Sequence, residues 1–259
     1  MSIELKRSQR GQTMVLTLCN PEMRNALGPE IYAAGMTALN DASADPLIRS
    51  VVIVGEGTVF CAGGNLQRLL ANREKPPEAQ YQSIDELHIW IQAIRACPKP
   101  IIAAVEGAAA GAGFSLALAC DMVVAARDAV FVMAYSNIAL SPDGGGSWSL
   151  SQALPRQLVT EVLMCGERIP ATRLHVLGLV NRISEPGTAL ADALQLAQQL
   201  NERAPNAIAS AKTLVSQAEQ ALMQSHLDLE REHFVRNLHQ ANAAEGIIAF
   251  LEKRSAKYV

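Results

Sequence analysis

The first 150 residues contain three glycine-rich turns, each located between a short apolar segment and a predicted helix. The first contains Gly63 and Gly64, the second extends over residues 107–113, and the third contains Gly144. Glycine allows another backbone or a ligand to approach closely. The first turn of a helix also carries N–H groups without intrahelical acceptors, so a helix start inside a core can bind an oxyanion or a phosphate.

The second turn joins a buried apolar run, residues 101–105, to an apolar helix predicted over residues 114–120. Its glycines, Gly107, Gly111 and Gly113, have neither the Gly-x4-Gly-Lys-Ser/Thr order of a phosphate loop nor the G-x-G-x-x-G order of a dinucleotide fold. Two interpretations stay open for this turn. Its small residues serve either close helix packing or binding at the helix start.

Asp143 lies in the sequence Pro142–Asp143–Gly144 and has two interpretations. Pro-Asp-Gly is a strong turn sequence, and aspartate caps helices such as the one predicted from near Gly145. Alternatively, Asp143 is a catalytic acid. If its carboxyl faces an apolar pocket, loss of hydration raises its pKa toward a value suited to proton transfer.

His88 lies on a predicted amphipathic helix whose apolar residues include Ile84, Leu87 and Ile91. It is either a partly exposed surface residue or a catalytic base. The histidines and cysteines form no H-E-x-x-H or C-x-x-C pattern, so we expect no metal site. The five scattered cysteines suggest reduced core thiols and therefore a cytoplasmic protein.

Composition excludes several classes of protein. The chain has 259 residues, a formal net charge of −3 and no long basic run, which argues against nucleic-acid binding. Although 49% of the residues are hydrophobic, no apolar run reaches the roughly 20 residues of a membrane helix. The first residues alternate like a strand and have no apolar stretch, so we expect no signal peptide. We therefore expect a small-molecule partner and no membrane.

Strands and helices alternate through most of the chain, which predicts an α/β fold, and only helices are predicted after about residue 186. Residues 73–80, which are polar and contain two prolines, are predicted to form a loop. We predict a core of residues 1–186 and a helical region of residues 187–259. Predicted strands cover residues 3–7, 13–18, 51–54, 101–105, 122–125, 130–133 and 179–183, and predicted helices cover 29–44, 84–94, 114–120, 188–203, 206–220, 221–241 and 244–254.

Five segments together resemble the crotonase family, the enoyl-CoA hydratase/isomerase group. They cover nearly the whole chain in the family's order, so the set is far more specific than any one member. The segments are Arg24–Leu27, Phe60–Leu66, residues 98–113, Ser141–Gly146 and the terminal helix from Gly246 to Arg254.

The resemblance implies that two backbone N–H groups hold the thioester carbonyl of an acyl-CoA and stabilise the anion that develops on it. By position these donors are Gly64 and Ala112. An oxyanion-hole donor typically contributes about 2.7–4 kcal/mol to catalysis. Many relatives have glycine where this chain has Ala112, which keeps the N–H but adds a methyl group beside the acyl site.

The acyl site departs from the hydratases of the family. Ser115 and Tyr135 stand where those enzymes have the two glutamates that activate water, and neither can act as a carboxylate base. Asp143 stands where several isomerases of the family have a catalytic aspartate and where a dehalogenase has its nucleophile. His88 corresponds to the dehalogenase's histidine, whereas Tyr135 replaces its pocket tryptophan.

The resemblance also implies a path for coenzyme A, which enters as part of the substrate and not as a separate cofactor. Asn65 stands where aspartate is common, which changes local hydrogen bonds. Arg24 is expected to contact a phosphate or ribose group. Other expected contacts are Ala26, Ala62, Gly63 and Leu66, with Phe250 and Lys253 completing the adenine end from the last helix of a neighbouring subunit.

The expected fold is a crotonase-type spiral of ββα units whose helical C-terminal region mediates trimerisation, giving a homotrimer or a hexamer. The expected function is isomerase-type or hydratase-type chemistry on an enoyl-CoA, including cyclic or aromatic-derived acyl groups, with Asp143 as acid/base. Two alternatives stay open. One is hydrolytic or dehalogenase-like chemistry with Asp143 as nucleophile and His88 as base, and the other is a non-catalytic CoA-binding relative.

Overall fold

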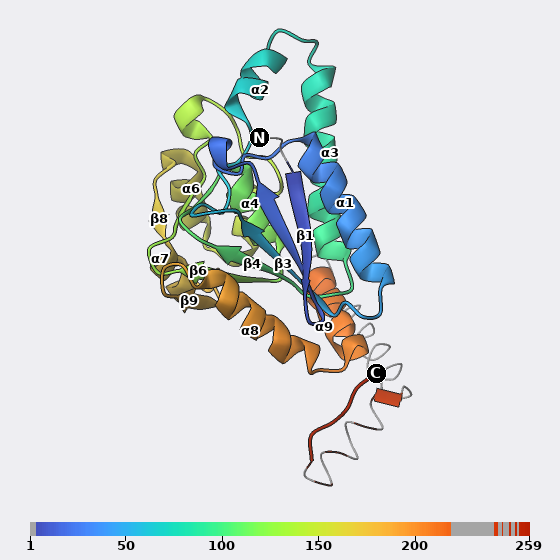
Figure 1. Ribbon diagram of the computed structural model, residues 1–259. Coiled ribbons are helices and arrows are strands. Elements are labelled where there is room, and N and C mark those ends of the chain that lie inside the picture. The colour runs from blue at the N-terminus through green and yellow to red at the C-terminus, as the bar shows by residue number, and fades with distance from the viewer. Residues whose placement is uncertain (1–3, 219–240, 243–244, 246–248, 250–251, 253) are drawn as a thin grey trace.

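The computed structural model describes residues 4–218, 241, 242, 245, 249, 252 and 254–259. Two sheets and a set of helices form the described part of the chain (Figure 1). The larger sheet has six strands in the order β1-β2-β3-β4-β6-β9, of which β1 and β2 are antiparallel and the other neighbours are parallel. Its strands are β1 Glu4–Arg10, β2 Thr13–Cys19, β3 Ser50–Gly55, β4 Ile101–Val105, β6 Met122–Ala126 and β9 Arg182–Ser184.

The smaller sheet has three strands in the order β5-β7-β8. Strand β5 is parallel to β7, and β7 is antiparallel to β8. Only two residues separate β4 from β5, so the chain passes from the larger sheet to the smaller one within the central segment. The strands are β5 Ala108–Ala110, β7 Val130–Val132 and β8 Ile169–Pro170.

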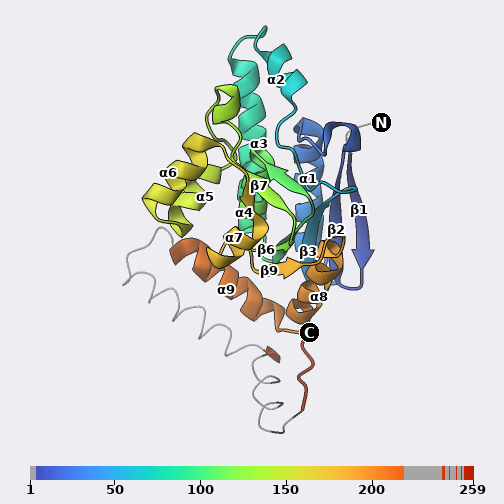
Figure 2. The ribbon, with the colours of Figure 1, turned by 90° about the vertical axis from the view of Figure 1, so that its left-hand side faces the viewer.

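Helices cover both faces of the larger sheet. Figure 1 shows α8 below this sheet and α1 to its right, and in Figure 2 α2 and the adjoining end of α3 extend from the top of the molecule. The helices are α1 Pro29–Ala44, α2 Leu66–Asn72, α3 Glu78–Ala96, α4 Ala112–Ala119, α5 Gly146–Ala153, α6 Arg156–Cys165, α7 Ala171–Val176, α8 Ala189–Asn201 and α9 Pro205–Ala218, with short 3-10 turns η1 Pro21–Met23 and η2 Ser136–Ile138.

Apolar side chains on the central strands point alternately to the two faces of the larger sheet, so both faces must be packed against other elements. Val51 and Ile53 of β3 belong to the main core, whereas Val52 and Val54 pack with Ala193 and other residues of α8. Successive strand residues point to opposite faces, so an uninterrupted apolar run fills two layers. The prediction of strands buried on both faces is confirmed.

Several predicted boundaries differ from the structure. Helix α3 begins at Glu78, because Pro77 occupies a helical conformation at its N-cap, so the predicted loop shortens to residues 73–77. The strand predicted over 179–183 starts only at Arg182, since Gly178 with φ of +81° turns the chain before it. Helices α6 and α7 were not predicted.

The helical character predicted after residue 186 is confirmed for α8 and α9. The division into residues 1–186 and 187–259 stays a prediction, and the expected helices over 221–241 and 244–254 lie largely outside the described residues. None of the helices in the described part of the chain combines the length and the apolar character that crossing a bilayer requires.

Candidate active site

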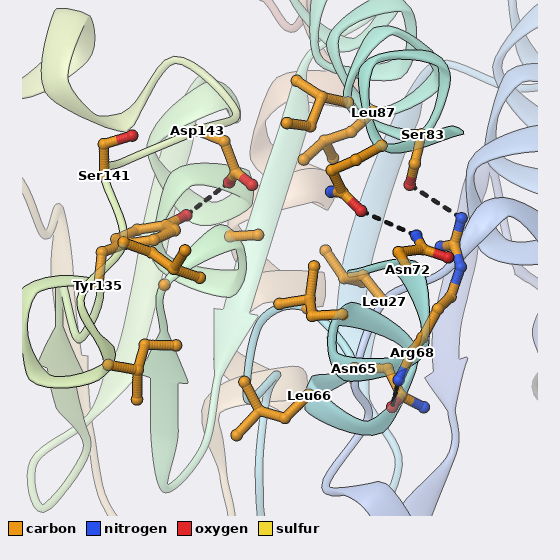
Figure 3. Close-up of a pocket in the computed structure, with 18 of the residues that line it drawn as sticks. Leu27, Asn65, Leu66, Arg68, Asn72, Ser83, Leu87, Tyr135, Ser141 and Asp143 are labelled. Carbon is orange, nitrogen blue, oxygen red and sulfur yellow. Dashed lines mark hydrogen bonds between the residues drawn. The ribbon is translucent and has the colours of Figure 1, made fainter. Parts of the chain in front are cut away.

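A cleft of about 860 Å³ lies between α2, α3, the start of α4 and the loop over residues 134–143. This volume is typical of a site for a small organic ligand. The wall combines apolar side chains with polar and charged ones, several of which Figure 3 shows. Apolar lining residues include Leu27, Leu69, Ile84, Leu87, Ile138 and Leu140.

The first two glycine-rich turns lie against each other at this cleft. Isolated parallel bridges join Leu27 to Gly64 and Cys61 to Ala109. Gly63 has φ of +92°, and a β-carbon added to it would lie 2.7 Å from the Ala110 carbonyl oxygen and 3.2 Å from the Ala112 nitrogen. Glycine is therefore required here both for the backbone conformation and for the close approach.

Gly64 and Ala112 both line the cleft. Ala112 is the first residue of α4, and the next two N–H groups bonded in that helix, those of Phe114 and Ser115, donate to the Gly111 carbonyl. Among the described residues, neither the Gly64 N–H nor the Ala112 N–H has a backbone acceptor. The N-terminal end of a helix favours negative charge, so this wall can donate hydrogen bonds to an anionic oxygen.

The Asp143 carboxylate points into the cleft. It accepts a hydrogen bond of 2.6 Å from the Tyr135 hydroxyl through Oδ1 (Figure 3). Burial raises the pKa of Asp143, while the Tyr135 hydrogen bond and the nearby His88 charge partly oppose that rise. Burial and the adjacent Asp143 carboxylate together raise the pKa of Tyr135, so the phenol remains a hydrogen-bond donor.

The backbone of Asp143 fits the interpretation as a turn residue, and its side chain fits the interpretation as an acid in the cleft. Its carbonyl accepts from Gly146 N–H at 3.2 Å, as in a turn, but no side chain caps α5. The Ser115 hydroxyl donates to the same Asp143 carbonyl at 2.9 Å. Ser115 thus holds the backbone of the loop, which leaves the carboxylate available to the cleft.

His88 is half-buried on α3 and lines the same cleft. The structure therefore brings together His88, Asp143, Gly64 and Ala112, the predicted catalytic set, around one cavity. Their roles in catalysis stay predictions at this point. No group of three or more His, Cys, Asp or Glu side chains suited to a metal ion occurs among the described residues.

The predicted CoA contacts divide into three groups. Ala62 and Leu66 line the cleft, whereas Arg24, Ala26 and Gly63 are not among its lining residues. Arg24 is exposed, and its carbonyl accepts from Ala62 N–H at 3.0 Å, so its backbone supports the first glycine-rich turn. Phe250 and Lys253 lie outside the described residues.

Polar side chains on α2 and α3 also line the cleft, and the sequence did not predict them as part of the site. Arg68 donates to Ser83 Oγ at 2.9 Å, and Asn72 donates to Gln80 at 2.8 Å. Asn65 caps α2 by accepting from Arg68 N–H at 3.1 Å, so the aspartate-to-asparagine departure keeps a capping acceptor. The only sequence pattern that could have indicated this wall is the presence of polar residues within the short, apolar-rich helix α2.

Comparison with known proteins gives consistent matches along the whole chain. A family model described as enoyl-CoA hydratase/isomerase matches residues 9–259. A 1,2-epoxyphenylacetyl-CoA isomerase of Escherichia coli is 33% identical over 259 residues, covering 100% of this chain and 98% of the relative. A 2,3-dehydroadipyl-CoA hydratase of the same organism is 33% identical over 255 residues, covering 98% of each.

The chain also resembles solved structures of this group. A crystal structure of an enoyl-CoA hydratase from Polaromonas sp. JS666 superposes with a TM-score of 0.98 at 65% identity, covering 98% of this chain and 99% of that one. The fold and these matches define a crotonase-fold enzyme of the lyase or isomerase type. The chain belongs to the enoyl-CoA hydratase/isomerase family, as its motifs predicted.

Proposed function

We propose that this enzyme binds an enoyl-CoA with the thioester carbonyl at the N–H groups of Gly64 and Ala112, and that Asp143 transfers a proton to or from the acyl group. One observation carries this proposal. Asp143 is the only carboxylic acid among the described residues that line the cleft. Acid/base chemistry at this site therefore centres on Asp143.

The two backbone donors supply the electrostatic part of the mechanism. Negative charge develops on the carbonyl oxygen as the thioester becomes an enolate, and fixed N–H groups stabilise it at about 2.7–4 kcal/mol per donor. Because their positions follow from backbone packing between the two glycine-rich turns, little reorganisation is needed during the reaction. Burial raises the pKa of Asp143, which is the direction that favours a carboxylic acid as a general acid/base.

Isomerase-type chemistry, in which one carboxylate moves a proton between two carbons, fits a single acid best. Hydration stays within the proposal, because relatives named as a hydratase and as an isomerase have the same 33% identity to this chain. Coenzyme A forms part of the substrate. The family resemblance supports a homotrimer or a hexamer, and light scattering would give the mass of three or six chains.

The proposal is tested with Asp143→Asn and a panel of enoyl-CoA thioesters. Removing a general acid/base lowers kcat by about 10²- to 10⁴-fold, while the thioester still binds. Asp85→Asn, on the exposed side of α3, is the matched control and keeps the wild-type rate. A stable acyl or aryl adduct on Asp143, detected by mass spectrometry, would contradict proton transfer and favour the nucleophilic alternative with His88 as base.

A further inference from the structure

A half-buried arginine lies in the cleft opposite the proposed catalytic acid. Arg68 lines the cavity from α2, and its guanidinium donates to Ser83 Oγ at 2.9 Å. Figure 3 shows the Asp143–Tyr135 pair on one wall and the Arg68–Ser83 pair on the other, with Leu27 and Leu87 between them. A ligand that reaches Asp143 therefore has a cationic wall within the same cavity.

The positions along α3 relate this wall to the reacting end of the substrate. Ser83 and Leu87 are four residues apart, which is about 6 Å along a helix and places them on one face. Leu87 packs against Gly144, the residue after Asp143, since a β-carbon on Gly144 would lie 3.5 Å from Leu87 Cδ2. Arg68 therefore contacts α3 one helical turn away from Leu87, the residue that packs against the loop carrying Asp143.

Tyr32 lines the cleft together with Asp143 and Arg68. Its buried phenol lines the cleft, and burial raises its pKa most. The Asp143 carboxylate raises that pKa further, whereas the Arg68 guanidinium lowers it.

The Glu30 carboxylate lies near the Arg68 guanidinium, since Glu30 Oε2 and Arg68 Nη1 lie 3.1 Å and 4.0 Å from the position of a β-carbon added to Gly28. Within the described part of the chain its side-chain hydrogen bond goes to the neutral Ser83, and no carboxylate forms an ion pair with it. The half-buried Arg68 guanidinium loses part of its hydration, and a ligand carboxylate that accepts two of its N–H groups would restore that loss. Anions are the ligands that this arrangement selects.

We propose that Arg68, supported by Ser83, recognises a carboxylate at the far end of a short acyl chain, so that the preferred substrates are thioesters of dicarboxylic acids. This inference rests on the proposed function, since it takes the acyl group to extend from Gly64 and Ala112 past Asp143. The same chemistry would also suit a phosphate of coenzyme A. The experiment below separates the two sources.

Binding of three unreactive ligands, adipoyl-CoA, hexanoyl-CoA and free CoA, is measured by calorimetry. Adipoyl and hexanoyl groups have equal length and differ in the terminal carboxylate. The wild-type enzyme should bind adipoyl-CoA at least about tenfold more tightly than hexanoyl-CoA, as expected for charged hydrogen bonds. Arg68→Gln should abolish this preference while hexanoyl-CoA still binds, and Arg68→Lys should keep part of it.

Arg73→Gln is the matched control, because Arg73 also lines the cleft but is exposed, and the adipoyl-to-hexanoyl ratio should not change. If Arg68→Gln weakens all three ligands equally, Arg68 contacts coenzyme A and the inference is wrong. A wild-type enzyme that shows no preference for adipoyl-CoA also overturns it. Failure to bind any acyl-CoA, in contrast, contradicts the proposed function itself.

Discussion

At the scale of single residues, Asp143 combines a structural task with the chemical task proposed for it. Its carbonyl is held by Ser115 Oγ and by Gly146 N–H, so the backbone contacts do not involve the carboxylate. The carboxylate instead meets the Tyr135 hydroxyl inside the cleft. The two residues at the family's glutamate positions, Ser115 and Tyr135, therefore both act on Asp143: one fixes its backbone and the other its side chain.

Removing the Tyr135 hydroxyl should change the pH dependence of the reaction. The hydrogen bond from Tyr135 favours the ionised form and lowers the pKa of Asp143, against the larger effect of burial. In Tyr135→Phe this pKa rises, so the acidic limb of the kcat/KM profile moves to higher pH if Asp143 acts as a base. Tyr32→Phe, in the same cleft but without a hydrogen bond to Asp143, should leave that limb in place. An unchanged limb in Tyr135→Phe would contradict the assignment.

At the scale of elements, the site depends on how closely α4 approaches the first glycine-rich turn. A β-carbon on Gly113 would lie 2.5 Å from the Cys61 carbonyl oxygen and 2.7 Å from Cys61 Cβ. Cys61 also pairs with Ala109 through an isolated bridge. Any increase in the separation between α4 and residue 61 would therefore move the N–H groups of Gly64 and Ala112 apart.

Gly113→Ala tests this dependence. Overpacking should cost about 1–3 kcal/mol of unfolding free energy, and kcat should fall because the two donors no longer fit one oxygen. Gly11→Ala is the control. Gly11 has φ of +59° with nothing within 4 Å of the added carbon, so alanine should cost about 1–2 kcal/mol without reaching the site. Equal kcat in the two variants at similar stability, measured by urea unfolding and steady-state kinetics, would show that the spacing is unimportant.

The sequence correctly predicted the helices and strands whose positions depend on neighbouring residues. Pro29 at the start of α1 and the apolar runs of β3 and β4 gave correct positions, since helix entry and two-sided burial depend on neighbouring residues. Helix α6 was missed because its buried side chains, Val159 and Val162, form too short an apolar stripe.

The site could be predicted only in part, for a related reason. Asp143, His88, Gly64 and Ala112 were found through motifs, and the structure places all four around one cleft. The Arg68–Ser83 pair joins α2 to α3 across a proline-containing connection whose geometry no local pattern specifies. Long-range side-chain pairs of this kind depend on packing and do not follow from spacing along the chain.

At the scale of the whole molecule, the two sheets bring distant segments to one cavity. Residues 61–64 follow β3 and residues 109–112 follow β4 of the larger sheet, and the loop over residues 134–143 follows β7 of the smaller sheet. Parallel strands with crossover helices place the segments after their carboxyl ends at one edge, where α/β proteins commonly bind ligands. The catalytic proposal therefore follows from the topology as well as from individual residues.

The central claim is that the thioester carbonyl lies at Gly64 and Ala112 with the acyl group beside Asp143. The most direct measurement is a crystal structure of Asp143→Asn with a bound enoyl-CoA. We predict that the carbonyl oxygen lies within about 3 Å of both backbone nitrogens, with the acyl α- or γ-carbon next to residue 143. A carbonyl bound away from these two N–H groups, or an acyl chain directed away from residue 143, would contradict the account.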